Sequence, residues 1–144
     1  MHGPYGPAGA IVPTNPSLGP NGYRGIYLAK ASEMSCCWIA PHAEILVKKP
    51  PHTSTLVAGF VMPDLPEFAR GQSLTVTIDG KPVDTERLQD GQHLYRMHLP
   101  AELAAMHGTL PIRIDASTDY VPAKAGVSTD SRHLAAVLMY LYFV

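Results

Sequence analysis

The residues of this chain that are best suited to bind a ligand are its single tryptophan, Trp38, and several tyrosines and charged side chains. A sugar presents a flat apolar face of C–H groups that an aromatic ring can cover, while carboxylates and guanidinium groups bind its hydroxyls. A lone tryptophan is also often a core residue, so a core role and a ligand-binding role are both open for Trp38. The candidate ligand-binding residues are Tyr27, Glu33, Trp38, Tyr120, Asp130 and Arg132.

The segment Asp130–His133 contains residue types that serve as nucleophile, acid and base, but their spacing does not suit catalysis. Neighbours in sequence point apart, whereas a catalytic triad is built from side chains that converge in space. A turn fits better, in which Asp130 accepts backbone hydrogen bonds and Arg132 pairs with a carboxylate. Other carboxylate pairs, in loops or on an edge strand, are interpreted as solvated. They are Asp64 with Glu67 and Asp84 with Glu86. We therefore expect no catalytic residues and no enzyme activity.

Metal and redox chemistry are not indicated either. The seven histidines are dispersed, and no two have the close spacing that assembles ligands around a transition metal. The two cysteines, Cys36 and Cys37, are neighbours, and a disulfide between neighbours is strained. The interpretation is a reduced pair in an intracellular protein, with no metal and no cofactor.

Length and charge limit the classes of partner. The length of 144 residues and mass of 15.5 kDa predict one globular domain. The net charge of -1 indicates that the chain lacks the positively charged surface that binds nucleic acid. The pair Lys48 and Lys49 is expected to end a strand at the surface. The apolar run Leu134–Val144 is too short to span a membrane, and residues 1–10 do not resemble a secretory signal. We expect no membrane partner and a cytoplasmic location by default, with an extracellular or virion context left open.

Residues 1–24 are rich in proline and glycine, which disfavours both a helix and a central strand. We interpret this segment as an N-terminal arm, followed by a β domain at residues 25–144. Apolar residues of the arm can anchor it on its own domain or on a neighbouring subunit. The second possibility predicts a homo-oligomer formed through the arm.

Short β-favouring runs separated by turn residues predict an all-β fold, an antiparallel two-sheet sandwich of jelly-roll type. The clearest run is 73–78, in which leucine, valine and isoleucine alternate with serine and threonine. Asp79 and Gly80 then predict a two-residue hairpin turn, and a return strand with Pro82 near its start predicts a sheet edge. One short helical turn is expected at 100–107. The expected strands are 25–29, 35–39, 43–48, 55–61, 73–78, 83–87, 93–98, 110–115 and 135–143.

Two of these strands pose questions of orientation. In 93–98 the apolar face contains either Leu94 or Tyr95. In 135–143 both faces are apolar, so the strand is expected to be central or covered on both sides, with tyrosines in the core or an interface. Strict alternation places Val137, Met139, Leu141 and Phe143 on one face and Leu138, Tyr140 and Tyr142 on the other.

The segment Tyr120–Arg132 contains an aromatic-x-Pro-Ala stretch followed by Gly-x-Ser-x-Asp-x-Arg, and a last strand comes after it. Upstream, a strand at 25–27, Glu33, Trp38 and a strand ending at Pro50 complete the pattern. This order resembles small bacterial β-sandwich domains, similar to carbohydrate-binding modules, that are attached to glycosyltransferases and methyltransferases. The resemblance implies a non-catalytic module whose partner is a glycan or a glycan-modifying enzyme. The alternative is a structural subunit of a phage particle or multimeric shell that uses the N-terminal arm for contacts.

Overall fold

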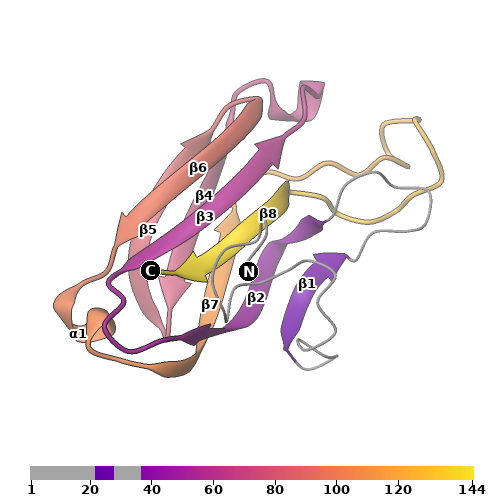
Figure 1. Ribbon diagram of the computed structural model, residues 1–144. Helices are drawn as coiled ribbons and strands as arrows, with labels where there is room; N and C mark the ends of the chain where they lie inside the picture. Colours follow the sequence, from indigo (N-terminus) through magenta and orange to yellow (C-terminus); the bar gives the residue numbers. More distant parts are fainter. Residues whose placement is uncertain (1–21, 28–36) are drawn as a thin grey trace, which may run out of the picture.

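The computed structural model describes residues 22–27 and 37–144 (Figure 1). Within these ranges nearly all of the regular secondary structure is β-strand, as the sequence predicts. Of the predicted arm at residues 1–24, residues 1–21 lie outside the described residues, and so does Glu33. Tyr23 and Arg24 belong to β1, so the strand includes the last two residues of the predicted arm. The elements are β1 (Tyr23–Tyr27), β2 (Trp38–Lys49), β3 (Thr55–Met62), a 3₁₀ turn (Pro66–Phe68), β4 (Gln72–Ile78), β5 (Lys81–Leu88), β6 (Gly91–His98), α1 (Ala101–Ala104), β7 (Gly108–Ala116) and β8 (Ala136–Phe143).

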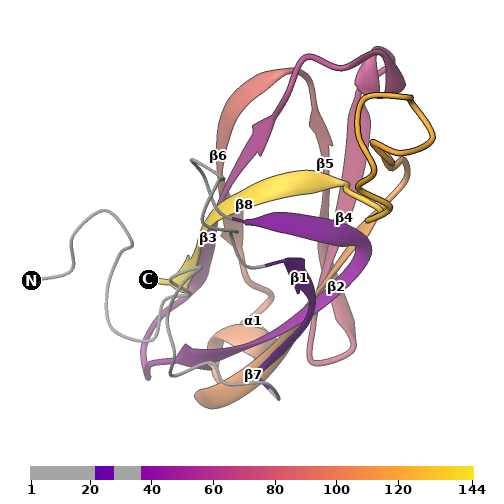
Figure 2. The same ribbon diagram turned by 90° about the vertical axis from the view of Figure 1, so that its right-hand side faces the viewer.

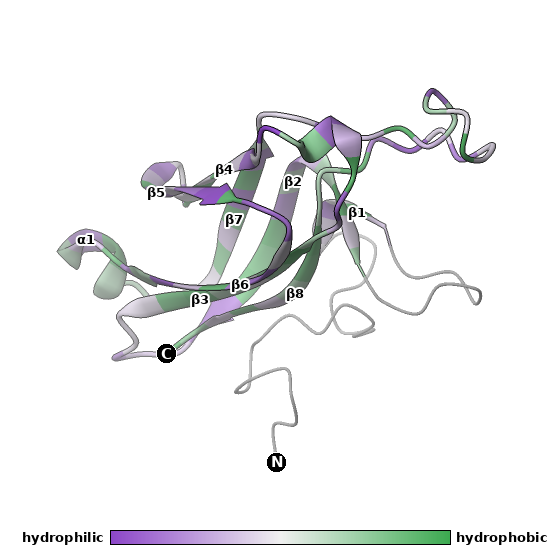
Figure 3. Cartoon of the chain, turned by 90° about the horizontal axis from the view of Figure 1, so that it is seen from above, coloured by the Kyte–Doolittle hydropathy of each residue, from purple (hydrophilic) through white to green (hydrophobic). Residues whose placement is uncertain are grey.

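The strands form one hydrogen-bonded antiparallel sheet in the order β5-β4-β7-β2-β8-β3-β6, with β1 paired to β2. The sheet curls around the core, so that β4, β7 and β2 face β3, β6 and β8 (Figures 2 and 3). Its two end strands meet where the Tyr95 hydroxyl of β6 donates to the Arg87 carbonyl of β5 at 3.0 Å. The predicted division into two jelly-roll sheets is not confirmed, because the hydrogen bonding is continuous from β5 to β6.

Strand β2 makes the sheet continuous. The sequence predicts two strands here, but the structure has one, which pairs with β8 through Trp38 and Ile39 and with β7 from His42 onward. Pro41 lies where the partner changes, a position at which its missing N–H costs no ladder bond. Gly25 of β1 lies against this bend, and a Cβ there would be 2.5 Å from the His42 carbonyl oxygen.

The predicted hairpin between β4 and β5 is confirmed. Asp79 and Gly80 both have positive φ, 50° and 78°, as a type I′ turn requires, and β5 is an end strand. Leu74, Val76 and Ile78 are fully buried in the core, as their alternation predicts.

Strand β8 is central, as predicted, but its side chains do not alternate strictly. Gly59 of β3 pairs with Tyr140 and Phe60 pairs with Leu138, so Met139 is the extra residue of a bulge. A bulge shifts every later residue to the opposite face. Leu138, Leu141 and Phe143 therefore lie in the core, whereas Tyr140 and Tyr142 lie on the outer side and remain half-buried.

Lys49 is fully buried at the end of β2, whereas the sequence placed it at the surface. Its ammonium donates to three carbonyls, those of Thr53 at 2.7 Å, Ala104 at 2.9 Å and Met106 at 2.7 Å. Burial lowers the pKa of this lysine. The contacts fasten α1, the predicted helical turn between β6 and β7, to the end of β2.

Cys37 is 1% exposed and disulfide-bonded, so the prediction of a reduced cysteine is wrong for Cys37. That prediction depended on an assumed compartment, which the residues themselves do not determine. Cys36 lies outside the described residues. Neither helical segment of the described ranges has the length and apolarity to cross a membrane.

Candidate functional site

Strand pairing places the predicted residues Tyr27 and Trp38 on one outer surface. Trp38 stands opposite Tyr27 of β1 and opposite Val137 of β8. Its neighbour Ile39 is fully buried, and successive side chains of a strand point to opposite faces, so Trp38 points outward. Directly opposed residues share a face, so Tyr27 and Val137 lie on the same face as Trp38. Val137 is buried, with 5% of its surface exposed, whereas Tyr27 and Trp38 are half-buried and also contact the core.

This row of side chains continues across the sheet. Val137 pairs with Val61 of β3, and Val61 pairs with Gln92 of β6. Beside it, Tyr140 of β8, Gly59 of β3 and Leu94 of β6 form a second row. We call this surface the aromatic face. Its members are Tyr27, Trp38, Gly59, Val61, Gln92, Leu94, Val137, Met139 and Tyr140.

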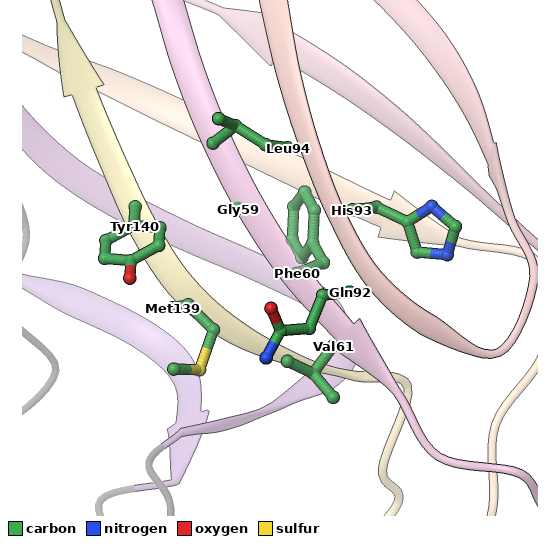
Figure 4. Close-up of a pocket in the computed structure, with 8 residues that line it drawn as sticks. All are labelled: Gly59, Phe60, Val61, Gln92, His93, Leu94, Met139 and Tyr140. Atoms are coloured by element: carbon green, nitrogen blue, oxygen red, sulfur yellow. The ribbon is translucent and has the colours of Figure 1, made fainter.

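A hollow of about 300 Å³ lies in the aromatic face, above Gly59 (Figure 4). The Tyr140 ring occupies the space above this glycine, because a Cβ at position 59 would be 2.5 Å from Cδ2 of the ring. Leu94, on the other side of the hollow, is 60% exposed. Gln92 adds an amide at the rim. The hollow thus combines apolar side chains, the Tyr140 ring, the Gln92 amide and the imidazole-bearing residue His93. It is lined by Gly59, Phe60, Val61, Gln92, His93, Leu94, Met139 and Tyr140.

Sequence reasoning missed Tyr140 and Leu94 as binding candidates. The sequence predicted that Tyr140 lies in the core or in an interface, and it left open whether the Leu94 side chain points into the core or outward. The structure turns Tyr95 to the core side, where it packs against the core, and Leu94 to the outside. The available signal was Gly59, since a glycine inside a β-favouring run often marks a bulge or a close approach.

Arg132 and Asp130, two further predicted residues, come together beside Tyr27. The Arg132 guanidinium carbon lies 5.3 Å from the centre of the Tyr27 ring, within the range of a cation–π contact. Its Nη2 lies 2.7 Å from Oδ2 of Asp130, and its Nε lies 3.0 Å from both carboxylate oxygens. The Arg132 backbone N–H also donates to Asp130 Oδ1 at 3.0 Å. The predicted turn, with Asp130 capping and Arg132 paired, is confirmed.

The loop that carries this pair is anchored by Gln72, a fully buried amide at the start of β4. Its nitrogen donates to the carbonyls of Thr118 at 2.5 Å and Ala135 at 3.1 Å. Its oxygen accepts from the Ser117 hydroxyl at 3.0 Å and the Thr118 N–H at 2.9 Å. Both ends of the segment between β7 and β8 are therefore fastened to one side chain.

Tyr120 does not join the aromatic face. It is 7% exposed, and its ring meets Phe68 edge-on, with 6.5 Å between the ring centres. Its backbone exchanges hydrogen bonds with Leu134, which closes the loop. Tyr120 therefore contributes to the core under the loop.

The outer surface of β1, β2 and β7, by contrast, is charged. Arg24 pairs with Glu44 at 2.6 Å, and Asp115 accepts from Arg113 at 3.0 Å and from His42 at 2.7 Å. Burial alone raises the pKa of Asp115, but the hydrogen bonds from His42 and Arg113 outweigh it and lower the pKa overall. These ion pairs are exposed and contribute little to stability.

Of the predicted solvated pair, Asp84 is exposed as expected, whereas Glu86 is less solvated than the sequence suggests. Glu86 is half-buried, and burial, a hydrogen bond with Asp84 and the charge of Asp84 raise its pKa to about 7. Glu86 pairs with Leu74 of β4 on the core side of the sheet, away from the aromatic face. In residues 22–27 and 37–144, no three His, Cys, Asp or Glu side chains gather in a way that could hold a metal ion.

No model of a known protein family matches the sequence, and no curated protein matches it. Among solved structures, a family 35 carbohydrate binding module from Clostridium thermocellum is similar in fold, with a TM-score of 0.47 and 12% sequence identity. The similarity covers 83% of this chain and 85% of that chain.

Proposed function

We propose that this chain is a non-catalytic module that binds carbohydrate on its aromatic face. The observation that carries the proposal is the hollow above Gly59, bordered by the Tyr140 ring and the exposed Leu94. Tyr27 and Trp38 extend the same surface. Rings and apolar side chains suit the C–H faces of sugars.

Polar groups around these rings suit the hydroxyls of a sugar. The Gln92 amide can donate and accept at the rim of the hollow. Arg132 is held by Asp130 over the Tyr27 ring, so its position is fixed before a ligand arrives. Fixed groups lose little conformational entropy on binding, which favours affinity.

The proposal of a non-catalytic role follows from the same residues. Glycoside hydrolysis uses two carboxylic acid groups on opposite sides of the bond that is cleaved. None of the described residues lining the hollow carries a carboxylate. The carboxylate of Asp130 is engaged by Arg132. The aromatic face can hold a sugar, but the residues described in the hollow do not supply the acid and base for its hydrolysis.

Tyr140 provides the direct test. A panel of neutral oligosaccharides is titrated into the protein, with heat and Trp38 fluorescence as readouts. Tyr140→Ala should weaken binding about tenfold or more, because it removes the ring beside the hollow. Tyr140→Phe keeps the ring and should bind within about threefold of the natural protein. Equal affinities of all three proteins would contradict the assignment of the hollow.

Two leucines supply a matched pair of variants. Leu94→Ala removes apolar surface from the aromatic face, whereas Leu46→Ala removes it from an exposed position opposite Pro111, on the charged surface. Only Leu94→Ala should weaken binding. Trp38→Ala should lose binding and keep the fold if Trp38 contacts the sugar. A Trp38→Ala protein that unfolds would assign this tryptophan to the core.

A further inference from the structure

We infer that the ligand is a neutral polysaccharide bound along an internal stretch of its chain, which crosses β1, β2, β8, β3 and β6. This inference depends on the proposed function and adds the class of ligand. The first row of the aromatic face contains one residue from each of these five strands: Tyr27, Trp38, Val137, Val61 and Gln92.

The length of this row exceeds one sugar. Neighbouring strands lie about 4.8 Å apart, so five strands extend over about 19 Å. A pyranose ring covers about one such spacing. A single sugar would therefore use only a part of the face, whereas about four linked sugars would cover it.

The rings are distributed along the row. Tyr27 and Trp38 are on adjacent strands at one end, and Tyr140 lies one strand further, in the neighbouring row. Leu94 and Gln92 follow on β6. Val137 itself is buried, so Tyr140 is the side chain that a sugar would meet on β8. Sugars of an extended chain would thus meet Tyr27, Trp38 and Tyr140 in turn, followed by Leu94. Such a series of contacts favours binding of an internal stretch of a polymer over binding of its terminal sugar, because the contacts are shared among several sugars.

The hollow also allows a chain to continue past it. β6 is the last strand of the sheet order, and Leu94 on it is 60% exposed. A pocket for a chain end would instead surround the terminal sugar on several sides. The hollow is a depression in an extended surface, beside the Tyr140 ring that lies against Gly59.

The charges indicate a neutral polymer. The Arg132 guanidinium carbon lies 5.3 Å from the centre of the Tyr27 ring, and the Asp130 carboxylate meets this guanidinium with three N–O distances of 3.0 Å or less. This pairing cancels its charge locally. Gln92 at the rim of the hollow is uncharged. A uronate or sulfate group would gain little binding energy from these residues, whereas sugar hydroxyls can form hydrogen bonds with the Arg132–Asp130 pair and with Gln92.

The experiment measures affinity as a function of chain length. Glucose and mannose oligomers of one to six β-1,4-linked units are titrated by calorimetry, each with its reducing end intact or reduced to the alditol. Affinity should rise about fivefold with each unit up to about four units and then level off. Reduction of the chain end should change the affinity of the longer oligomers by less than about twofold.

Variants locate the sugars along the row. Tyr27→Ala and Leu94→Ala, at opposite ends, should each shorten the length at which affinity levels off and leave the dimer unaffected. Tyr140→Ala should weaken every length. A monosaccharide that binds as tightly as the tetramer, or loss of binding on reduction of the chain end, overturns the inference and leaves the proposed function standing. No binding of any length, soluble or on insoluble glucan and mannan, overturns both.

Discussion

Replacement of Gln72 by methionine should loosen the loop that holds Arg132 beside the aromatic face. Methionine has a similar length but neither donates nor accepts as an amide does. The change removes the partner of both backbone groups of Thr118, of the Ala135 carbonyl and of the Ser117 hydroxyl. The loop then loses its attachment to β4 at both ends.

The structure sets the size of the effect. Each of the four hydrogen bonds is worth about 1 kcal/mol, which gives an upper value of about 4 kcal/mol. Three of them are only partly buried, so water can replace part of the loss, whereas the bond to Ala135 is buried. We therefore expect a loss of about 2–3 kcal/mol in the free energy of unfolding, or about 5–10 °C in the melting midpoint. The domain should remain folded, because domains of this size are stable by about 5–15 kcal/mol.

Urea unfolding measures the global loss, and hydrogen exchange at the Tyr120 and Leu134 amides measures the local one. These two amides bond to each other's carbonyls and close the loop, so their exchange should accelerate more than that of β4. Ser117→Ala removes one of the four bonds, and with it the bond that the Ser117 hydroxyl accepts from the Ser73 N–H at 3.1 Å. Neither bond is fully buried, so this variant should cost about 1 kcal/mol, less than Gln72→Met. A Gln72→Met protein no less stable than Ser117→Ala would refute the role of Gln72 as the anchor.

Four further changes test other features. Lys49→Met should cost about 2–4 kcal/mol in urea unfolding, because three carbonyls lose a charged donor; a neutral effect would contradict this. Glu86 has a pKa of about 7 in the folded state against 4.5 for a glutamate side chain in water, so its stabilising effect is complete below about pH 4.5 and is lost as the pH rises through 7. The loss should be of order 1 kcal/mol after solvent screening, and Glu86→Gln should abolish this part of the pH dependence of unfolding. Gly80→Val should cost about 1 kcal/mol or more through backbone strain alone, since a Cβ there meets no atom within 4 Å, while Gly80→Asn should cost less. Removal of residues 1–21 should lower the oligomeric state in light scattering if the arm exchanges between subunits, and an unchanged state would exclude that exchange.

The parts of the fold that local patterns control could be predicted from the sequence. The alternation at Leu74, Val76 and Ile78 and the turn at Asp79 and Gly80 depend on residues within a few positions of one another. The continuity of β2 could not be predicted, because Pro41 normally interrupts a strand. It is tolerated here only because β8 and β7 pair with different parts of β2. Burial of Lys49 likewise depends on carbonyls more than 50 residues away in the chain.

The charged pair of the candidate site could be predicted because its two residues are close in sequence. Tyr140 and Leu94 were missed because the direction of their side chains depends on strand pairing. Asp130 and Arg132 are two residues apart, and the predicted turn brings their side chains together. Tyr120 carries the same aromatic signal as Tyr27, but a bridge to Leu134 directs it into the core. Sequence alone does not distinguish these two tyrosines, because their exposure depends on the strand or loop segment that each one faces.

Tyr140 shows why the central part of the aromatic face was hidden in the sequence. Strict alternation in β8 places Tyr140 on the same side as Leu138, but the extra residue Met139 reverses every residue after it. The reversal directs Leu141 and Phe143 into the core and turns Tyr140 outward over Gly59. A side chain at position 59 would displace the ring, so the bulge and the glycine are required together. Neither is informative without knowledge of which strand pairs with β8, and that pairing joins segments about 80 residues apart in the chain.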